Sequence, residues 1–553
     1  MGVIIKAGLL ATVLLVFYKV KTWLLARDFR KWEEAHGCGP LPSVKNKLPG
    51  GLERFALLVT GLGDKDFLDD FVRKRFNDNG NTHRIHSLFR TVVSTAEPEN
   101  IQAILATQFH DFNLGPARHG NLFALLGNGI FNSDGEPWAH YRAQLKPQFT
   151  RDQVSDLEAA DRHLNILYKA LPEESSAGWT SEVDLKPLFF NLTLDASTEF
   201  LFGHSVNSQA RALSSDNTTS EDVKLDKDFA EAMTYAQEYI AYRLRFANLY
   251  WMANSKKFQQ ACQTVKDFGD KYVRIALDPN NKHSTVNSDG KERFVLLNAV
   301  VEETKDPIEV RDQMLHLLLA GRDTTSSLLC WVFLLLSRNP SEFQILRNAV
   351  LEEFGSASKP TAEMTFSSLK ACKPLTNLLY EALRIYPIVP LNGRRAVRNT
   401  TLPTGGGPDG KQPIAVKKGE NVGFISYVMH RRHDIWGEDA DEFRPARWEK
   451  RKIGWNYVPF SGGPRVCLGR EYLFVLFLLG EFMSRVEFTN EICSRTEQYA
   501  LTEAAFVVAR FAQRFDAIDG VDITSPIKKK MSLTMAPASV KVRLHRATEP
   551  EEV

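Results

Sequence analysis

A short motif near the C-terminal end, F-x-x-G-x-R-x-C-x-G, constrains the fold of this chain more than any other feature. It is formed by Phe460, Gly463, Arg465, Cys467 and Gly469. Glycines on both sides of a cysteine allow a tight turn whose backbone N–H groups point at the sulfur, and such hydrogen bonds tune a bound metal. The nearby arginine can pair with an anionic group. The motif therefore predicts a thiolate that ligates iron, the alternative being a structural cysteine buried in a glycine loop.

The composition is that of an ordinary globular protein with reduced thiols. The 553 residues are 43% hydrophobic and 25% charged, so the chain can bury a sizeable core. The formal net charge is +2 and no basic tract contains interleaved aromatic residues, so nothing argues for nucleic acid as a partner. The six cysteines are scattered and form no C-x-x-C pair, which argues against a disulfide framework or a zinc site.

The N-terminal segment differs from the rest of the chain. Residues 2–18 are apolar apart from Lys6, and a cluster of lysines and arginines follows them. Their length approaches the ~20 residues of a membrane span, and the basic cluster predicts that the body of the protein faces the cytosol. A cleaved signal peptide is the alternative, but no small-residue cleavage site follows the apolar region. We expect residues 1–30 to be a single-pass anchor in the endoplasmic reticulum membrane and residues 31–51 to be a Pro/Gly-rich hinge.

Helical patterns dominate from residue 52 to about residue 395. The longest is apolar on too many faces for a surface helix, so residues 311–340 are predicted to cross the core. Residues 388–425 change to short alternating stretches around a Gly/Pro loop, which predicts a small sheet. The expected fold is mainly α with a small β-sheet region, in one catalytic domain over residues 52–546 with a tail over residues 547–553.

Further motifs, in the right order ahead of the cysteine loop, resemble the cytochrome P450 superfamily of haem-thiolate enzymes over nearly the whole chain. The sequence A-G-R-D-T-T at residues 320–325 is similar to the oxygen-activation segment, with Asp323 and Thr324 as the acid–alcohol pair. A hydroxyl lodged in a local helix break, with a carboxylate behind it, can relay protons while bulk water is excluded. In a plain helix the threonines would only bond back to the preceding turn.

The same resemblance implies the residues that hold the cofactor and those that support it. The implied cofactor is haem b, ligated by Cys467. Its implied contacts in the cysteine loop and elsewhere are Phe460, Gly463, Arg465, Gly469, Trp138, Arg142 and Arg394. Glu381 and Arg384 of E-x-x-R, with Arg447, are implied to form a structural ion-pair network behind the thiolate loop.

Several segments also look like the fungal alkane and fatty-acid hydroxylase branch of that superfamily, which implies hydroxylation of an aliphatic chain. The sequence departs from the branch at Gly393, where a bulkier residue is expected near the substrate entrance. The implied partners are O2, a lipophilic small molecule, a membrane and a separate NADPH–cytochrome P450 reductase. A haem-thiolate isomerase or dehydratase acting on a peroxide, and a non-catalytic haem-binding protein, are the alternatives.

Residues 472–497 stand out because joining Glu471 directly to Gln498 yields an uninterrupted helical pattern like that of the branch. Either these 26 residues are an insertion tolerated as a surface excursion, or they are translated from a retained intron. A chain that carries them is expected to displace the following helix and to bind haem poorly.

Overall fold

The computed structural model describes residues 2–60, 66–87, 90–149, 157–172, 175, 177–213, 221–278, 294–470 and 499–547. The fold is mainly helical with small sheets, in agreement with the sequence. The chain divides into two compact units. The first unit comprises Met1–Arg54, Phe67–Asn113 and Asn392–Ile425, and the second comprises Phe55–Asp66, Leu114–Leu391 and Ser426–Val553.

The first unit is built on a mixed five-stranded sheet with the strand order β1-β2-β8-β5-β3. Its strands are β1 (Thr82–Ser87), β2 (Arg90–Thr95), β8 (Asn421–Phe424), β5 (Asn392–Ala396) and β3 (Phe112–Asn113). Strand β2 runs antiparallel to β1 and parallel to β8. Strands β5 and β8 confirm the sheet that the sequence predicts near residues 388–425. The sequence analysis did not predict strands β1 and β2. Short β-branched runs such as R-T-V-V-S-T favour a strand, but this preference is lost when hydrophobic periodicity is averaged over a window as long as a helix.

The Pro/Gly-rich segment is held against this unit by backbone hydrogen bonds. Helix α1 (Gly2–Ala35) includes the first residues of the predicted hinge. Beyond it, Gly39 N–H donates to the Pro413 carbonyl (2.8 Å) in the hairpin of β6 (Thr400–Gly406) and β7 (Gln412–Val416). The N–H of Val44 donates to the Arg84 carbonyl (2.9 Å) in β1. The remaining elements that begin in this unit are η1 (Pro49–Gly51), α2 (Leu52–Thr60), η2 (Phe67–Arg73), α3 (Lys74–Asn79), α4 (Pro98–Gln102), η3 (Ala103–Thr107) and η4 (Phe109–Asp111).

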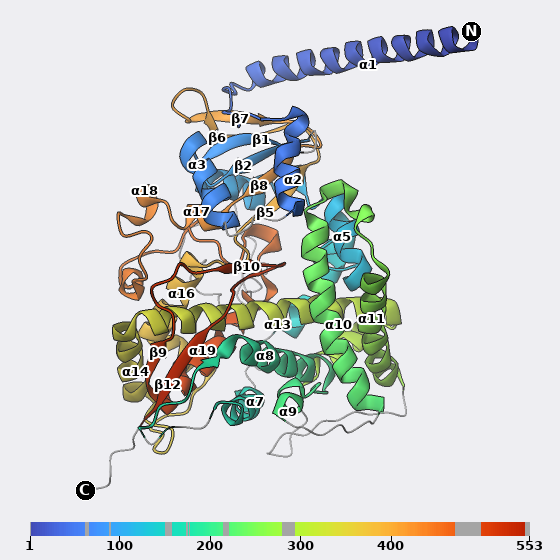
Figure 1. Cartoon of the computed structure of the whole chain (residues 1–553). Helices are drawn as coiled ribbons and strands as arrows, with labels where there is room; N and C mark the ends of the chain where they lie inside the picture. The colour runs from blue at the N-terminus through green and yellow to red at the C-terminus, as the bar shows by residue number, and fades with distance from the viewer. Residues whose placement is uncertain are drawn as a thin grey trace, which may run out of the picture. The chain divides into compact units, whose positions relative to one another are not determined.

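The second unit is organised around the long central helix α13 (Pro307–Arg338), which Figure 1 shows beside α8 (Leu185–Phe202). The helix begins where Asp306 Oδ1 accepts the Ile308 N–H (2.9 Å) and where Pro307 occupies the first turn. Among the described helices it alone is long and apolar enough to cross a membrane, but most of it is buried inside the protein. It is therefore the core helix that the sequence predicts.

Helices and C-terminal strands surround α13. The helices and short helical turns of this unit are α5 (Pro116–Leu126), α6 (Gly135–Leu145), η5 (Lys146–Gln148), α7 (Leu157–Lys169), α9 (Ser208–Leu213), α10 (Glu221–Leu244), η6 (Ala247–Met252), α11 (Lys256–Leu277), α12 (Leu296–Glu303), α14 (Pro340–Phe354), α15 (Phe366–Ala371), α16 (Lys373–Ile385), α17 (Ser426–Met429), α18 (His433–Trp436), η7 (Pro445–Glu449), η8 (Gly463–Arg465), η9 (Leu468–Arg470) and α19 (Tyr499–Arg514). The strands are β4 (Val183–Asp184), β12 (Lys541–Arg546) and β9 (Phe515–Gly520) in one sheet, and β10 (Lys529–Met531) and β11 (Met535–Pro537) in another. Trp331 of α13 donates its Nε1–H to the Met535 carbonyl (2.9 Å) and so ties β11 to the core.

Helix α19 bears on the expected effect of residues 472–497, which themselves lie outside the described residues. It packs in the core against α13, α14 and α16, with Ala504 and Phe511 buried. The helix also contacts η9, the turn that directly follows Cys467. The helix therefore lies in the core beside η9, and the expected effect of residues 472–497 on its position and on haem binding stays a prediction.

Candidate functional site

Cys467 lies in a closed turn between η8 and η9. Its N–H donates to the Phe460 carbonyl (3.1 Å), and the thiol is half-buried. Gly463 has φ of +63°, in the left-handed region that favours glycine. A side chain at Gly462 would place its Cβ 2.5 Å from the Trp455 ring, so this position also requires glycine. The glycines of the motif thus shape the turn that presents the sulfur, and Gly469 follows within η9.

Two arginines and a tryptophan lie against this turn. Trp138 and Arg142 are four residues apart on α6 and share one face of that helix. Arg142 donates from Nη1 to the Val466 carbonyl (3.0 Å), the residue before the cysteine. The guanidinium carbon of Arg465 lies 4.3 Å from the Trp138 ring centroid and that of Arg142 lies 5.9 Å from it. The structure therefore brings together Trp138, Arg142, Arg465 and Cys467 as the sequence predicts.

Asp134 is a site residue that the sequence analysis missed. Its carboxylate accepts from Arg465 Nη2 (2.9 Å) and from the N–H groups of Leu114 (2.9 Å) and Gly115 (3.2 Å). An aspartate directly before a helix normally caps the N-terminus of that helix. The sequence therefore indicates only a capping role for Asp134. Here the side chain makes no capping bond to α6 and turns to the arginine instead.

The charges around the cysteine turn fit an anionic cofactor. Burial is the main cause that lowers the pKa of Arg465 to about 10, and the positive charges of Arg118 and Arg142 lower it further against the opposing effect of Asp134. Burial also lowers the pKa of Arg118. Arg118 and Arg465 lie near the single carboxylate of Asp134, and Arg142 adds a third positive charge near Arg465, so the local field is positive, which suits the two carboxylates of a haem. A half-buried thiol in the same turn is a soft ligand suited to its iron.

The loop that carries Asp134 is fixed to the central helix by two further residues that the sequence analysis missed. Asp312 accepts the N–H of Asn128 (2.9 Å), and His316 Nδ1 accepts the N–H of Phe131 (3.4 Å). The rings of His316 and Phe131 also stack, with centroids 5.5 Å apart. Burial lowers the pKa of His316 to about 3, so the imidazole is neutral and can accept at Nδ1. The loop thus links α13 to the arginine beside the cysteine.

Between Asp312 and Ser337 of the central helix, only the acid–alcohol segment retains accessible surface. Ala320, Gly321 and Thr324 are partly exposed, whereas the neighbouring turns of α13 are buried. Accessible surface in a helix that crosses the core means that α13 borders a space at this segment. The expected helix break is not observed: α13 is continuous, and Thr324 donates its hydroxyl to the Ala320 carbonyl (2.6 Å). A hydroxyl that bonds back to the residue four positions earlier is compatible with an unbroken helix.

Asp323 is buried beside this segment in a position that favours proton binding. The residue is 3% exposed, and burial raises the pKa of its carboxyl against the opposing charge of Arg322. The ion pair is loose, with Arg322 Nη1 3.6 Å from Asp323 Oδ1. Arg322 instead donates to two side chains of α10, Thr234 Oγ1 (2.8 Å) and Gln237 Oε1 (3.3 Å).

Glu381, Arg384 and Arg447 form one buried cluster in the second unit. Arg384 donates to both carboxylate oxygens of Glu381 (2.9 and 2.8 Å), and Arg447 Nε donates to Oε1 (3.0 Å). The Arg444 N–H (3.0 Å) and Trp448 Nε1–H (2.9 Å) donate to the same carboxylate. Arg384 also donates to the carbonyl groups of three later residues, His430, Ala440 and Glu442. The cluster therefore joins α16 to the segment that leads to the cysteine loop.

Arg394 belongs to the first unit and stays a predicted cofactor contact. It is buried in β5, and its Nη1 donates to the Gly393 carbonyl (2.9 Å) and to Asn392 Oδ1 (3.4 Å). The neighbouring glycine has a packing reason, since a Cβ on Gly393 would lie 3.1 Å from the carbonyl oxygen of Val422 on the paired strand. The bulkier residue expected at this position would require that strand to shift.

Comparison with known proteins points to a family of haem-containing enzymes, in agreement with the cysteine turn and the arginines beside it. The family model described as "Cytochrome P450" matches residues 49–472. The chain is 42% identical to cytochrome P450 monooxygenase g430 of Fusarium sp over 526 residues, 94% of this chain and 87% of that protein. It is 42% identical to cytochrome P450 52A4 of Candida maltosa over 465 residues, 83% of this chain and 80% of that protein. It is 40% identical to cytochrome P450 52A12 of Debaryomyces hansenii over 502 residues, 89% of this chain and 90% of that protein.

Proposed function

Because the chain belongs to the cytochrome P450 family and is a monooxygenase of that family, we propose that it hydroxylates a lipophilic, aliphatic substrate. The observation that carries the proposal is the acid–alcohol pair on the core helix, in which Thr324 lies at the accessible segment and the adjacent Asp323 is buried. Leu317, Leu318 and Leu319 precede this segment and make its surroundings apolar. The likeness to the fungal alkane and fatty-acid hydroxylase branch supports an alkane, a fatty acid or a lipid-like metabolite as substrate.

The family implies a haem-iron cofactor, and we propose haem b with the Cys467 thiolate as its ligand. When bound, the haem iron supplies the dioxygen chemistry, in which one oxygen atom enters a C–H bond and the other leaves as water after two electrons and two protons arrive. Arg142 and Arg465 would bind the two haem carboxylates as paired charges. Thr324 holds a proton at Oγ1, and Asp323, whose pKa is raised by burial, replaces that proton.

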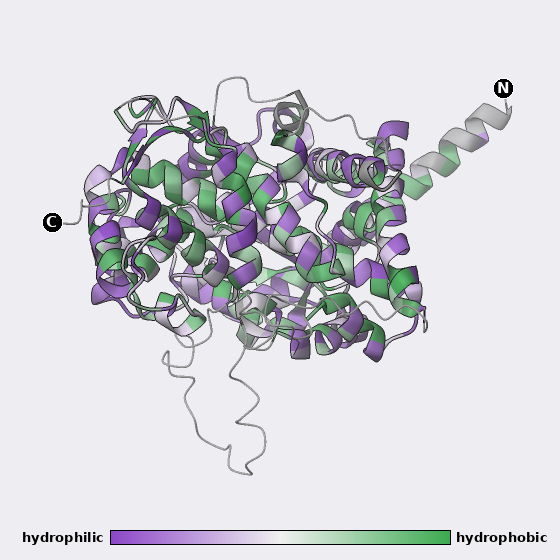
Figure 2. Cartoon of the chain, turned by 90° about the horizontal axis from the view of Figure 1, so that it is seen from below, coloured by the Kyte–Doolittle hydropathy of each residue, from purple (hydrophilic) through white to green (hydrophobic). Residues whose placement is uncertain are grey.

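The proposed partners are a membrane and a separate NADPH–cytochrome P450 reductase. Helix α1 keeps its apolar side chains exposed: Leu9, Leu14 and Phe17 are each at least 60% accessible. Figure 2 shows hydrophobic colouring on part of the N-terminal helix. Such a surface supports the proposal of a single-pass anchor in the endoplasmic reticulum membrane with a cytosolic catalytic body. Incubation with reductase, NADPH and a panel of alkanes, fatty acids and terpenoids tests the substrate class directly.

The role of Thr324 is tested by a Thr324→Ala variant. The helix should remain intact, since alanine favours helix and the lost hydroxyl bonded only to its own preceding turn. Loss of the positioned proton should divert electrons to hydrogen peroxide and lower the fraction of NADPH recovered in product by about tenfold. Measurement of NADPH, product and peroxide in the same reaction gives that fraction.

Thr324→Ser is the matched control because it keeps the hydroxyl, and it should stay coupled. Full coupling in the alanine variant would contradict the proton role of Thr324. Product formation from an organic peroxide without NADPH or O2 would favour the isomerase or dehydratase alternative. The retained pair of Asp323 and Thr324 argues against that alternative.

We also propose that residues 472–497 are dispensable, whether they are an insertion or a retained intron. The proposal is supported by the contact between η9 and α19, and by the match to the family model, which ends at residue 472. A variant without these residues should fold, keep the thiolate signature, and gain up to about 2 kcal/mol because a shorter connection costs less loop-closure entropy. Denaturant unfolding of both forms measures the difference.

Loss of the thiolate signature in the shortened variant would show that the segment is required. Sequencing of the mature transcript separates the two origins. Reads that run unbroken through codons 472–497 in most messages indicate a true insertion, and reads that skip them indicate a retained intron.

A further inference from the structure

Arg322 places a positive charge inside the core helix α13, directly before Asp323. The residue is 5% exposed. A buried charge is strongly destabilising unless an opposite charge or a set of hydrogen bonds compensates it. The adjacent carboxylate is the nearest opposite charge in the sequence, yet Arg322 Nη1 lies 3.6 Å from Asp323 Oδ1, too far for a hydrogen bond. The two buried charges are therefore close but not bonded to each other.

Helix α10 holds the guanidinium group of Arg322 instead. Its Nη2 donates to Thr234 Oγ1 (2.8 Å), and its Nη1 donates to Gln237 Oε1 (3.3 Å). These two acceptors are three residues apart and so lie on one face of α10, which crosses α13 in the view of Figure 1. Arg322 Nε and Asp323 Oδ1 make no hydrogen bond within the part of the chain that the structure describes. A donor and an acceptor of opposite charge thus remain unused in neighbouring residues.

A second arginine–aspartate pair in the same helix shows the direct alternative. Arg311 precedes Asp312, and both its Nε (3.0 Å) and its Nη2 (2.7 Å) donate to Asp312 Oδ1. Neighbouring residues of α13 can therefore form an ion pair with two hydrogen bonds. In Arg311 only Nη1 is held by another helix, through Asp270 of α11 (3.2 Å), whereas both Nη groups of Arg322 are held by α10. We infer that this hold keeps Arg322 from its own neighbour.

The difference between the two pairs affects how readily each carboxyl binds a proton. Burial raises the pKa of both Asp312 and Asp323. At Asp312 the hydrogen bonds from Arg311 oppose this effect, whereas at Asp323 the charge of Arg322 is the one opposing cause among the described residues. The ring of Phe190 on α8, 5.8 Å from the guanidinium carbon, is neutral, as are the two acceptors on α10. Because charges interact more strongly at shorter distance, a direct bond from Arg322 would favour the ionised carboxylate.

We propose that Arg322 is a positioning residue through which helix α10 keeps Asp323 able to bind a proton. This rests on the proposed function, in which Asp323 replaces the proton that Thr324 holds, and it adds the group that controls that replacement. While α10 holds Arg322, the Asp323 carboxyl binds its proton. Once released, Arg322 pairs with Asp323 in the manner of Arg311 and Asp312, and the carboxyl stays ionised.

A Thr234→Val/Gln237→Leu double variant tests the hold of α10, because it removes both acceptors and replaces them by apolar side chains of similar size. On the full-length ferric holoenzyme without substrate, infrared difference spectra follow the carbonyl band of the protonated Asp323 carboxyl against pH, and Asp323→Asn identifies that band. The pH at which half of the band is lost should fall by about one in the double variant. This is a tenfold lower proton affinity, the effect of about one charge-assisted hydrogen bond. Less NADPH should then be recovered in product near pH 7.

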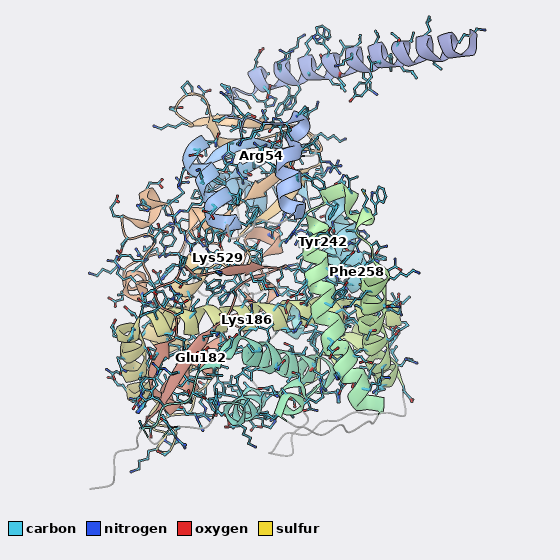
Figure 3. The ribbon with its side chains drawn as sticks, in the orientation of Figure 1. Arg54, Glu182, Lys186, Tyr242, Phe258 and Lys529 are labelled. Atoms are coloured by element: carbon cyan, nitrogen blue, oxygen red, sulfur yellow. The ribbon has the colours of Figure 1, made fainter. Side chains whose placement is uncertain are left out.

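Arg322→Leu should move the same midpoint to higher pH, because it removes the charge that opposes burial at Asp323. Arg322→Lys keeps a positive charge that can donate to the acceptors on α10, so its midpoint should stay close to that of wild type. Tyr242→Phe is the matched control, since it removes a hydroxyl elsewhere on α10. Figure 3 labels this tyrosine. The control should behave as wild type.

The opposite directions of the two midpoints separate positioning from a merely structural role, which would lower the melting temperature and leave both midpoints in place. An unchanged midpoint in the folded double variant would overturn the proposal, as would the absence of a protonated Asp323 band in wild-type protein near pH 7. If the double variant does not fold, Gln237→Leu alone should still move the midpoint to lower pH. If the midpoints move as expected while the recovery of NADPH in product stays constant, the proton role in the proposed function fails and the control of Asp323 by Arg322 stands.

Discussion

A Cys467→Ser variant should lose both the thiolate signature in the carbon monoxide difference spectrum of the reduced protein and all substrate oxidation. A serine oxygen is a poor ligand for an iron site that depends on a soft thiolate. The surrounding turn should survive, because it is closed by backbone bonds, such as that from residue 467 to the Phe460 carbonyl, which the substitution keeps. Spectroscopy, haem content and NADPH-dependent product formation together measure the result.

Cys38→Ser serves as the control for this variant. Cys38 is also half-buried but lies in the first unit, in the segment after α1, so its replacement should leave the spectrum and the activity unchanged. Oxidation that persists in Cys467→Ser would contradict haem-thiolate catalysis. An unfolded Cys467→Ser protein would be recognised by circular dichroism, and Cys467→His would then test whether a different ligand restores haem binding without the thiolate signature.

A Glu381→Gln variant should fail to accumulate as folded protein. The carboxylate is fully buried and accepts from Arg384, Arg447, Trp448 and the N–H of Arg444. Glutamine keeps the volume but removes the charge and places an NH2 group among donors. Breaking a buried ion pair by removing one partner costs about 3–5 kcal/mol, against a total stability of about 5–15 kcal/mol for a typical protein. Soluble yield and denaturant unfolding give the measurement.

Glu352→Gln on α14 is the control, because Glu352 is exposed and surface substitutions usually change stability by less than ~0.5 kcal/mol. A Glu381→Gln protein as stable as wild type would show that the cluster is not a structural support. If stability were retained and only the thiolate signature were lost, the cluster would act on the cysteine loop rather than on the fold as a whole.

Much of the candidate site could be predicted because its parts are local in the sequence. The turn around Cys467 depends on glycines within a few residues of it, and the i,i+3 spacing places Glu381 and Arg384 on one face of α16. Helix α13 is similarly visible, since its apolar residues, its capping Asp306 and its length all lie in one segment. Each of these features needs only short-range geometry.

Residues that act across long sequence separations could not be predicted in this way. Asp134 pairs with Arg465, 331 residues away, and the sequence shows only an aspartate before a helix. In the sequence, Arg243 is one of several charged residues in an amphipathic helix. Only the structure shows that its guanidinium group is buried against Phe258 and Tyr250. The strands β9 and β12 also escaped prediction, because each is short and is stabilised by pairing with the other.

The sequence by itself determined the mainly helical fold, the core helix, the cysteine turn and the haem-thiolate family, because periodicity and motif spacing are properties of neighbouring residues. The tertiary structure alone decided the charge around each group: which arginine pairs with Asp134, which carboxylate holds Arg384 and Arg447, and which buried arginine is held by helix α10. It also decided that α19 returns to η9 despite the residues between them. The physical reason is that desolvation and charge pairing depend on distances in space, which the order of residues along the chain does not contain.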